Sequence, residues 1–225
     1  MKDGLLEKIR GYGHWRVNIR PQSPLPERLD LRRCQEVVEQ SCVSIRGWDY
    51  PHISRRNDEQ SGAERAGDYF ENWCDWRSQI EFWRMYRSGQ FISYNALNDD
   101  AEGYGQPGVG ALNIVDAIYT ISEFTDFAGR LMANVPFVEG VRVAIGLNET
   151  AGRQLSAGRN RIPFFEPKTT QASSIKVERQ ISPGDDTQEL AIDIMAELFD
   201  HFGWNPDKSQ LRGDQTKFYR REFSG

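Results

Sequence analysis

The sequence has no run of about 18 apolar residues, so we expect no membrane-spanning helix. Residues 1–13 mix charged and apolar side chains and lack the continuous apolar centre of a secretory signal. The three cysteines, Cys34, Cys42 and Cys74, cannot all pair and have no CxxC spacing, which is typical of free thiols in a reducing compartment. We therefore expect a cytoplasmic protein without membrane contact.

Histidine is also scarce. His14, His52 and His201 are too dispersed along the chain to indicate a zinc site, and no nucleophile elbow is present. The sequence therefore predicts no metal ion and no other cofactor, and it identifies no catalytic residue.

The chain lacks an excess of basic residues: its net charge of −5 argues against a general nucleic-acid binder. The cations are nevertheless concentrated in residues 1–33 and 208–222, whereas residues 58–75 are acidic. Two interpretations follow. The two ends meet and form a basic patch, or these are ordinary solvated charges. A protein is the expected partner, and nucleic acid stays open as the alternative.

What is present is a length of 225 residues, 38% hydrophobic content and a 12% aromatic share with six Trp. This composition is sufficient for a core without disulfides. No internal repeat occurs. We expect one α+β domain over residues 1–225, with a mobile loop near residues 54–67 and a basic C-terminal tail over residues 204–225.

Period-two alternation predicts strands, and apolar residues spaced by three and four predict helices. The predicted strands are His14–Arg20, Cys42–Arg46, Tyr69–Trp76, Val141–Leu147 and Ile175–Arg179. The predicted helices are Asp30–Gln40, Leu112–Met132 and Thr187–Phe202. Strands, a helix, strands and a helix follow one another, which predicts a mostly antiparallel sheet with helices packed on one face.

The clearest local pattern is a hairpin over Ile80–Leu97, with two alternating segments around Ser88-Gly89. A two-residue turn at this dipeptide would place Trp83 opposite Tyr94 and Met85 opposite Ile92. That apolar face should pack on the core.

The other hairpin face combines aromatic rings with polar groups and is the preferred binding site. Its members are Phe82, Arg84, Tyr86, Phe91 and Asn95. Exposed rings and a guanidinium stack on bases or on peptide side chains. Alternatively a second layer, formed by Trp48 and the 54–67 loop, covers this face.

Three weaker motifs have structural alternatives. Asp68, Glu71, Asp75 and Glu81 could bind Mg²⁺ in a nuclease, or form a solvated edge that discourages strand pairing. Gly103–Gly108 matches G-x-G-x-x-G, or is a flexible connector. The spacing of Arg46 and His52 resembles the Arg-x(4–6)-His signature of the HEPN ribonucleases, but that family is all-helical and Gly47 and Pro51 interrupt a helix here.

Three segments together resemble an uncharacterised family of bacterial proteins. They are Trp15–Pro21, Ser44–His52 and Ile80–Phe91, and the resemblance extends loosely to the last predicted helix. The resemblance implies an association with mobile or anti-phage defence systems. It supplies no catalytic residues.

The abundant aromatics and the polarised charge, without a complete catalytic set, favour a non-enzymatic binding or accessory subunit of a bacterial multi-protein complex. One alternative is a metal-dependent nuclease or phosphodiesterase. The other is a single-stranded nucleic-acid binding module.

Overall fold

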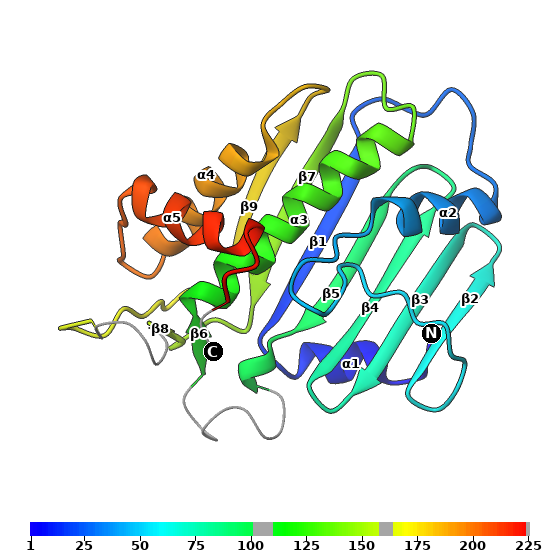
Figure 1. Cartoon of the computed structure of the whole chain (residues 1–225). Helices are drawn as coiled ribbons and strands as arrows, with labels where there is room; N and C mark the ends of the chain where they lie inside the picture. Colours follow the sequence, from blue (N-terminus) through cyan, green and yellow to red (C-terminus); the bar gives the residue numbers. More distant parts are fainter. Residues whose placement is uncertain (101–109, 158–163, 224–225) are drawn as a thin grey trace.

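The structure is a computed structural model, and it describes residues 1–100, 110–157 and 164–223. Its centre is a seven-stranded antiparallel sheet (Figure 1). In spatial order the strands are β2 (Ser61–Ala66), β3 (Tyr69–Trp76), β4 (Gln79–Tyr86), β5 (Phe91–Ala96), β1 (His14–Pro21), β7 (Val141–Asn148) and β9 (Ser174–Ile181). A small parallel pair joins β6 (Ala111–Asn113) to β8 (Gln154–Ser156).

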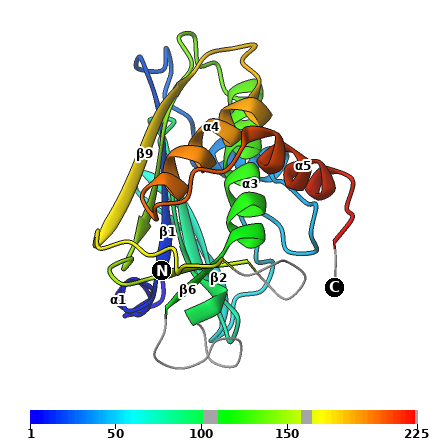
Figure 2. The ribbon, with the colours of Figure 1, turned by 90° about the vertical axis from the view of Figure 1, so that its left-hand side faces the viewer.

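The helices form a layer on one face of the sheet (Figure 2). This layer contains α2 (Leu31–Ser41), α3 (Ile114–Asn134), α4 (Thr187–Asp200) and α5 (Lys208–Tyr219). A short helix, α1 (Leu5–Arg10), contacts β4 and β5, where it packs on the opposite face, and a 3₁₀ turn, η1 (Asn98–Asp100), follows β5. The predicted α+β class, with a mostly antiparallel sheet, is confirmed.

Side-chain caps explain where the four longer helices begin. The Asp30, Asn113, Asp186 and Asp207 side chains each accept a hydrogen bond from a backbone N–H in the first turn. Helix α3 lies between α2 and α4 in this layer, and its buried Phe124 and Phe127 contact rings of the sheet and of the 43–50 segment. This arrangement fixes α3 as the wall opposite strands β1, β4 and β5.

The predicted hairpin exists, but its register was wrong by one residue. The loop has three residues, Arg87 to Gly89, because Tyr86 pairs with Gln90 and Gly89 adopts φ +85°. A three-residue loop that ends on a left-handed glycine is a common hairpin connection. Phe82 therefore faces Tyr94, and Trp83 faces Ser93. The shift moves all of strand β5 to the opposite face relative to the prediction.

Three local predictions need correction. Residues 61–66 form β2 instead of a loop, because they pair along β3 although they show no hydrophobic pattern. Cys42–Arg46 is not a strand, and only Val43 bridges to Tyr50. The presumed basic tail contains α5, whose Leu211 and Phe218 lie in the main core.

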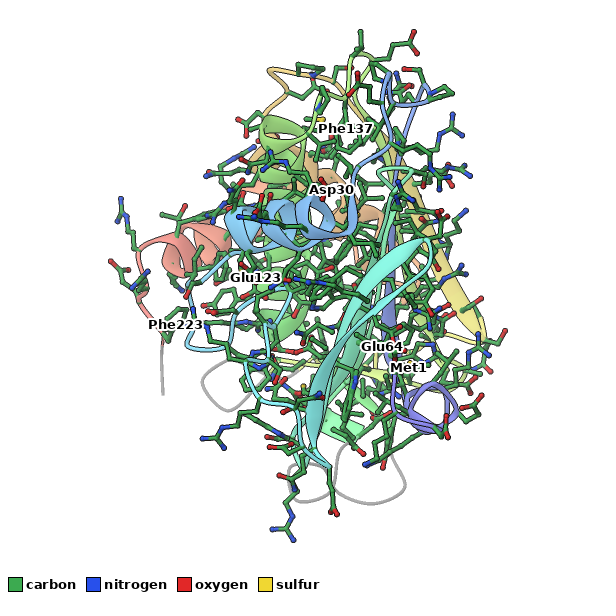
Figure 3. All side chains as sticks on the ribbon, turned by 90° about the vertical axis from the view of Figure 1, so that its right-hand side faces the viewer. Met1, Asp30, Glu64, Glu123, Phe137 and Phe223 are labelled. Carbon is green, nitrogen blue, oxygen red and sulfur yellow. The ribbon has the colours of Figure 1, made fainter. Side chains whose placement is uncertain are left out.

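The two basic ends do not combine into one patch. Lys2 and Lys8 both contact Asp75 at 2.6 Å, and Arg28 contacts Asp68. Lys208 and Arg212 pair with Asp193 and Glu189 on helix α4, and the Met1 amino group lies beside Glu64 next to β2 (Figure 3). These five cations of the two ends are therefore each paired with an acidic group near them.

Candidate binding pocket

A pocket of about 240 Å³ lies between the helix-facing side of the sheet and helix α3. The segment 46–50 forms one of its walls. The lining residues are Trp15, Arg46, Trp48, Asp49, Tyr50, Gln79, Glu81, Asn95, Ala96, Leu97, Asn98, Asp116, Thr120, Glu123 and Phe124. Four carboxyl groups, one guanidinium and several aromatic rings therefore share one small cavity.

Arg46 fastens the wall segment to helix α3. Its Nε and Nη2 donate to the two Glu123 oxygens at 2.9 and 2.8 Å, and its Nη1 donates to Asp116 at 2.5 Å. Thr120 accepts a further hydrogen bond at 2.8 Å. Asp116, Thr120 and Glu123 follow one another at spacings of four and three, so they share one helix face.

Arg46 stays positively charged. Burial lowers the pKa of this guanidinium, but Asp116 and Glu123 outweigh that effect and the pKa is raised. Glu123 (Figure 3) is 3% exposed, and its burial raises its own pKa while Arg46 opposes the increase. Because every guanidinium nitrogen of Arg46 donates to α3, Arg46 is a structural anchor of the pocket rather than a free cation.

Glu81 is the second buried carboxyl group and it lacks such an anchor. It is 5% exposed, and it accepts hydrogen bonds from Trp48 Nε1 at 2.7 Å and from Asn95 Nδ2. Burial raises its pKa to about 7; the nearby charge of Glu123 acts in the same direction, and the hydrogen bond from Trp48 opposes it. Glu81 therefore changes its protonation near neutral pH.

Asn95 leaves one polar atom of the pocket unsatisfied. Its Nδ2 donates to Glu81, which is the amide orientation that a carboxylate requires, and its Oδ1 is buried without a hydrogen-bond partner among the described residues. Buried acceptors without a partner are rare in folded proteins and unfavourable by about 1–3 kcal/mol. The pocket therefore favours an N–H or O–H donor.

Part of the negative charge of the lining is also left without a cation. Asp49 and Glu81 form no salt bridge within residues 1–100, 110–157 and 164–223, and Arg46 is the one cation among the lining residues of the described chain. Trp48, whose ring stacks on His52 at 4.0 Å, adds an aromatic wall. Carboxylates and ring faces both attract cations.

The five predicted binding residues do not form one surface, because the hairpin register differs. Phe82 is 2% exposed and stacks on Tyr94 at 5.2 Å, in a cluster covered by helix α1. Arg84 donates to Glu71 at 2.5 Å, and Tyr86 contacts the ring of Tyr69.

The other two residues of that prediction point toward the helices. Phe91 is fully buried against Phe127, and Asn95 lines the pocket. Helix α1, rather than Trp48 and the 54–67 segment, covers Phe82. Only Asn95 of the predicted set therefore belongs to the pocket.

The four acidic residues considered as a Mg²⁺ site likewise do not lie together. Glu71 and Asp75 pair with cations on the α1 side of the sheet, whereas Glu81 lies on the helix-facing side and Asp68 contacts Arg28. In the described ranges no group of three His, Cys, Asp or Glu side chains is arranged to hold a metal ion.

The two remaining motifs do not form a joint site either. Arg46 is bound to α3, and His52 stacks on Trp48 and is absent from the pocket lining, its pKa lowered by burial. The Gly103–Gly108 motif lies within residues 101–109, outside the described residues.

Sequence reasoning missed most of the pocket, although one pattern indicates it. The polar stripe of Asp116, Thr120 and Glu123 on a helix rich in apolar residues suggests a buried polar partner. The three segments that carry the family resemblance also meet here, through Trp15, the 46–50 wall and Glu81.

No family model matches the chain, and comparison with the curated proteins and with the solved structures found no match. Among the helices of the described residues, none has the length and apolar character needed to cross a membrane.

Proposed function

We propose that this protein is a non-enzymatic binding subunit whose pocket holds a cationic side chain of a partner protein. One observation carries the proposal: a buried Asn95 acceptor without a partner lies beside carboxyl groups that have no cation of their own. A guanidinium or an ammonium group supplies both the missing donor and the missing positive charge.

The size of the pocket supports a side chain rather than a free metabolite. Drug-sized ligands occupy cavities of about 300–1,000 Å³, whereas this cavity measures about 240 Å³. One arginine or lysine side chain, inserted from a partner surface, is a suitable occupant. Trp48 and Tyr50 offer aromatic contacts of the kind that binding hot spots use.

The resemblance to the bacterial family suggests the setting of this interaction. We propose a cytoplasmic multi-protein complex, with an anti-phage defence system as the context. The rival hypothesis, a metal-dependent nuclease or phosphodiesterase, requires acidic residues that lie on two faces of the sheet and are mostly ion-paired. Cleavage of labelled RNA or DNA with Mg²⁺ or Mn²⁺ that Glu71→Ala abolishes would overturn our proposal.

The direct test is titration with N-acetyl-arginine methylamide, followed through the NMR signal of the Trp48 indole N–H. The matched uncharged probe is the citrulline derivative, and the lysine derivative compares ammonium with guanidinium. We expect the arginine probe to shift the Trp48 signal and the citrulline probe to leave it unchanged. Equal binding of both probes would contradict a site selected by charge.

Variants locate the binding. Asp49→Asn should weaken it about tenfold or more, since a hydrogen bond to a charged group contributes about 1.5–3 kcal/mol. Asp193→Asn removes an exposed carboxylate on α4 and should have no effect.

A further inference from the structure

The half of the sheet formed by β1, β7 and β9 has a face without a helix layer. Figure 2 shows the longer helices on the other side of these strands, and α1 packs farther along the sheet, against β4 and β5. A groove of about 260 Å³ lies on this face. It is separate from the pocket, which opens on the helix-facing side, and it does not depend on the proposed function.

Strand β7 forms the floor of the groove. Its outward-facing positions include Ala144 and Gly146, and the register places Gly146 directly between Arg16 of β1 and Lys176 of β9. Two strand spacings separate these cations by about 10 Å at the backbone. The groove is therefore a channel with a small-residue floor and cationic walls.

The charge of this face is opposite to that of the chain. Arg16, Arg20, Arg142 and Lys176 are exposed there, and Glu178 is the one carboxylate among the groove residues of the described chain. Glu178 contacts three of these cations, Lys176 at 2.7 Å, Arg142 at 3.2 Å and Arg20 at 3.7 Å.

The fourth cation, Arg16, extends the positive charge of the groove toward helix α1. Arg16 lies 5.7 Å from the centre of the Tyr94 ring, and Arg10 of helix α1 lies 5.9 Å from the same ring. Four cations around one carboxylate, in a protein of net charge −5, form a local positive surface.

We infer that this groove binds the phosphate backbone of a single-stranded nucleic acid. Arginine is suited to phosphate because its planar guanidinium donates two parallel hydrogen bonds. The amides of Asn18 and Asn148 lie in the same groove and offer further neutral donors. A floor of Ala144 and Gly146 lets an extended strand lie close to the sheet.

The shape favours a single strand over a duplex. Proteins read duplex DNA by inserting a helix or a two-stranded ribbon into the major groove, and this face consists of strands within a continuous sheet. The composition favours nucleic acid over protein, because protein interfaces centre on aromatic or apolar anchors and exclude charge from their cores. The groove has charged walls, and among the described residues that line it there is no aromatic ring.

The cationic lining of the groove, which has no ring among its described residues, also determines how it would bind a nucleic acid. Proteins that bind single strands through base stacking gain about 1–3 kcal/mol from each base that stacks on an aromatic ring. Tyr94, the ring beside the groove, is only 8% exposed and offers no such stacking surface. Binding is therefore electrostatic, independent of sequence and sensitive to salt. Three to four phosphate contacts on a single strand give a slope of log K against log salt of about −2 to −3.

The test is fluorescence anisotropy of a labelled oligothymidine with the full chain, over a range of salt concentrations. We expect affinity to fall roughly 20- to 50-fold between 50 and 200 mM salt. Arg142→Ala and Arg16→Ala should each weaken binding several-fold and make the slope shallower by about 0.7. Glu178→Gln should tighten binding, because it removes the competing carboxylate.

The matched control is Arg212→Ala, which removes an arginine of similar exposure on helix α5. Arg212→Ala should bind like the wild type, and so should the pocket variant Asp49→Asn. Equal weakening by Arg212→Ala, or no binding at 50 mM salt, would overturn the inference. Tighter binding of polyglutamate than of oligothymidine would instead identify the groove as a site for acidic protein.

Discussion

The pocket and the groove lie on opposite faces of one sheet and hold their charges in opposite ways. In the pocket, Arg46 is fixed by two carboxylates and Glu81 is 5% exposed. In the groove, Arg142 is half exposed and shares Glu178 with two other cations. Buried charges need fixed partners of opposite charge, and the loss of a partner strongly lowers stability. Exposed charges contribute little to stability and stay accessible to ligands.

The largest expected effect on stability comes from removing the pocket anchor. Arg46→Ala should lower the free energy of unfolding by about 3–5 kcal/mol, because it leaves Glu123 buried without its cation. Urea denaturation measures this change. Arg212→Ala breaks a half-exposed pair and should leave stability close to that of the wild type. Equal effects of the two variants would remove the distinction between buried and exposed charge.

A change of similar size is expected under helix α1. Phe82→Ala should lower stability by about 3–5 kcal/mol, the usual cost of deleting a buried Phe. The control is Phe165→Ala, whose ring is fully exposed and whose loss should change stability by no more than about 0.5 kcal/mol. Thermal and urea unfolding of both variants check this. A Phe82→Ala variant as stable as the wild type would mean that α1 does not cover this face in solution.

Glu81 should make stability depend on pH. Its pKa is about 7 in the folded chain and 4.5 without the fold, so the folded state binds more protons between these values. Stability therefore falls as pH rises from 4.5 to 7, by an amount on the order of 3 kcal/mol from this group. Glu81→Gln should remove that part of the slope and stabilise the protein at pH 8. Denaturation curves at pH 5 and pH 8 give the comparison, and a wild-type-like slope in Glu81→Gln would contradict it.

The smallest effect on stability is expected in the groove. Arg142→Ala should change the free energy of unfolding by less than about 0.5 kcal/mol, because its side chain is half exposed. The same variant should weaken oligonucleotide binding several-fold, which the anisotropy assay measures. A large loss of stability would show that the groove cations serve the fold.

The sequence predicted the regular elements well where their hydrophobic pattern is strong. Strand β1 and helices α3 and α4 lie close to their expected positions, because each buries one face in the core and its sequence therefore shows a clear apolar period. Strand β2 could not be predicted, because its pairing with β3 leaves no apolar pattern in its sequence.

The candidate site was less predictable, for two physical reasons. The hairpin loop contains three residues instead of two, and a choice of one residue decides which face Phe91 and Asn95 occupy. Arg46 finds its carboxylates at least 70 positions further along the chain, and only the folded sheet and helix bring them together. Asn95 was identified for another reason and proved to line the pocket.

The order of the strands has a consequence for how copies of this chain meet. A sheet of this kind ends in two strands whose outer backbone groups can pair with another molecule. Here the two outermost strands are β2 and β9, and they carry Glu64 and Arg65 on one side and Lys176, Glu178 and Arg179 on the other. The central β5 has no charged residue at all. Both edge strands thus carry charge where an unwanted fibril-like extension would begin, and this charge opposes the growth of the sheet from one molecule into the next.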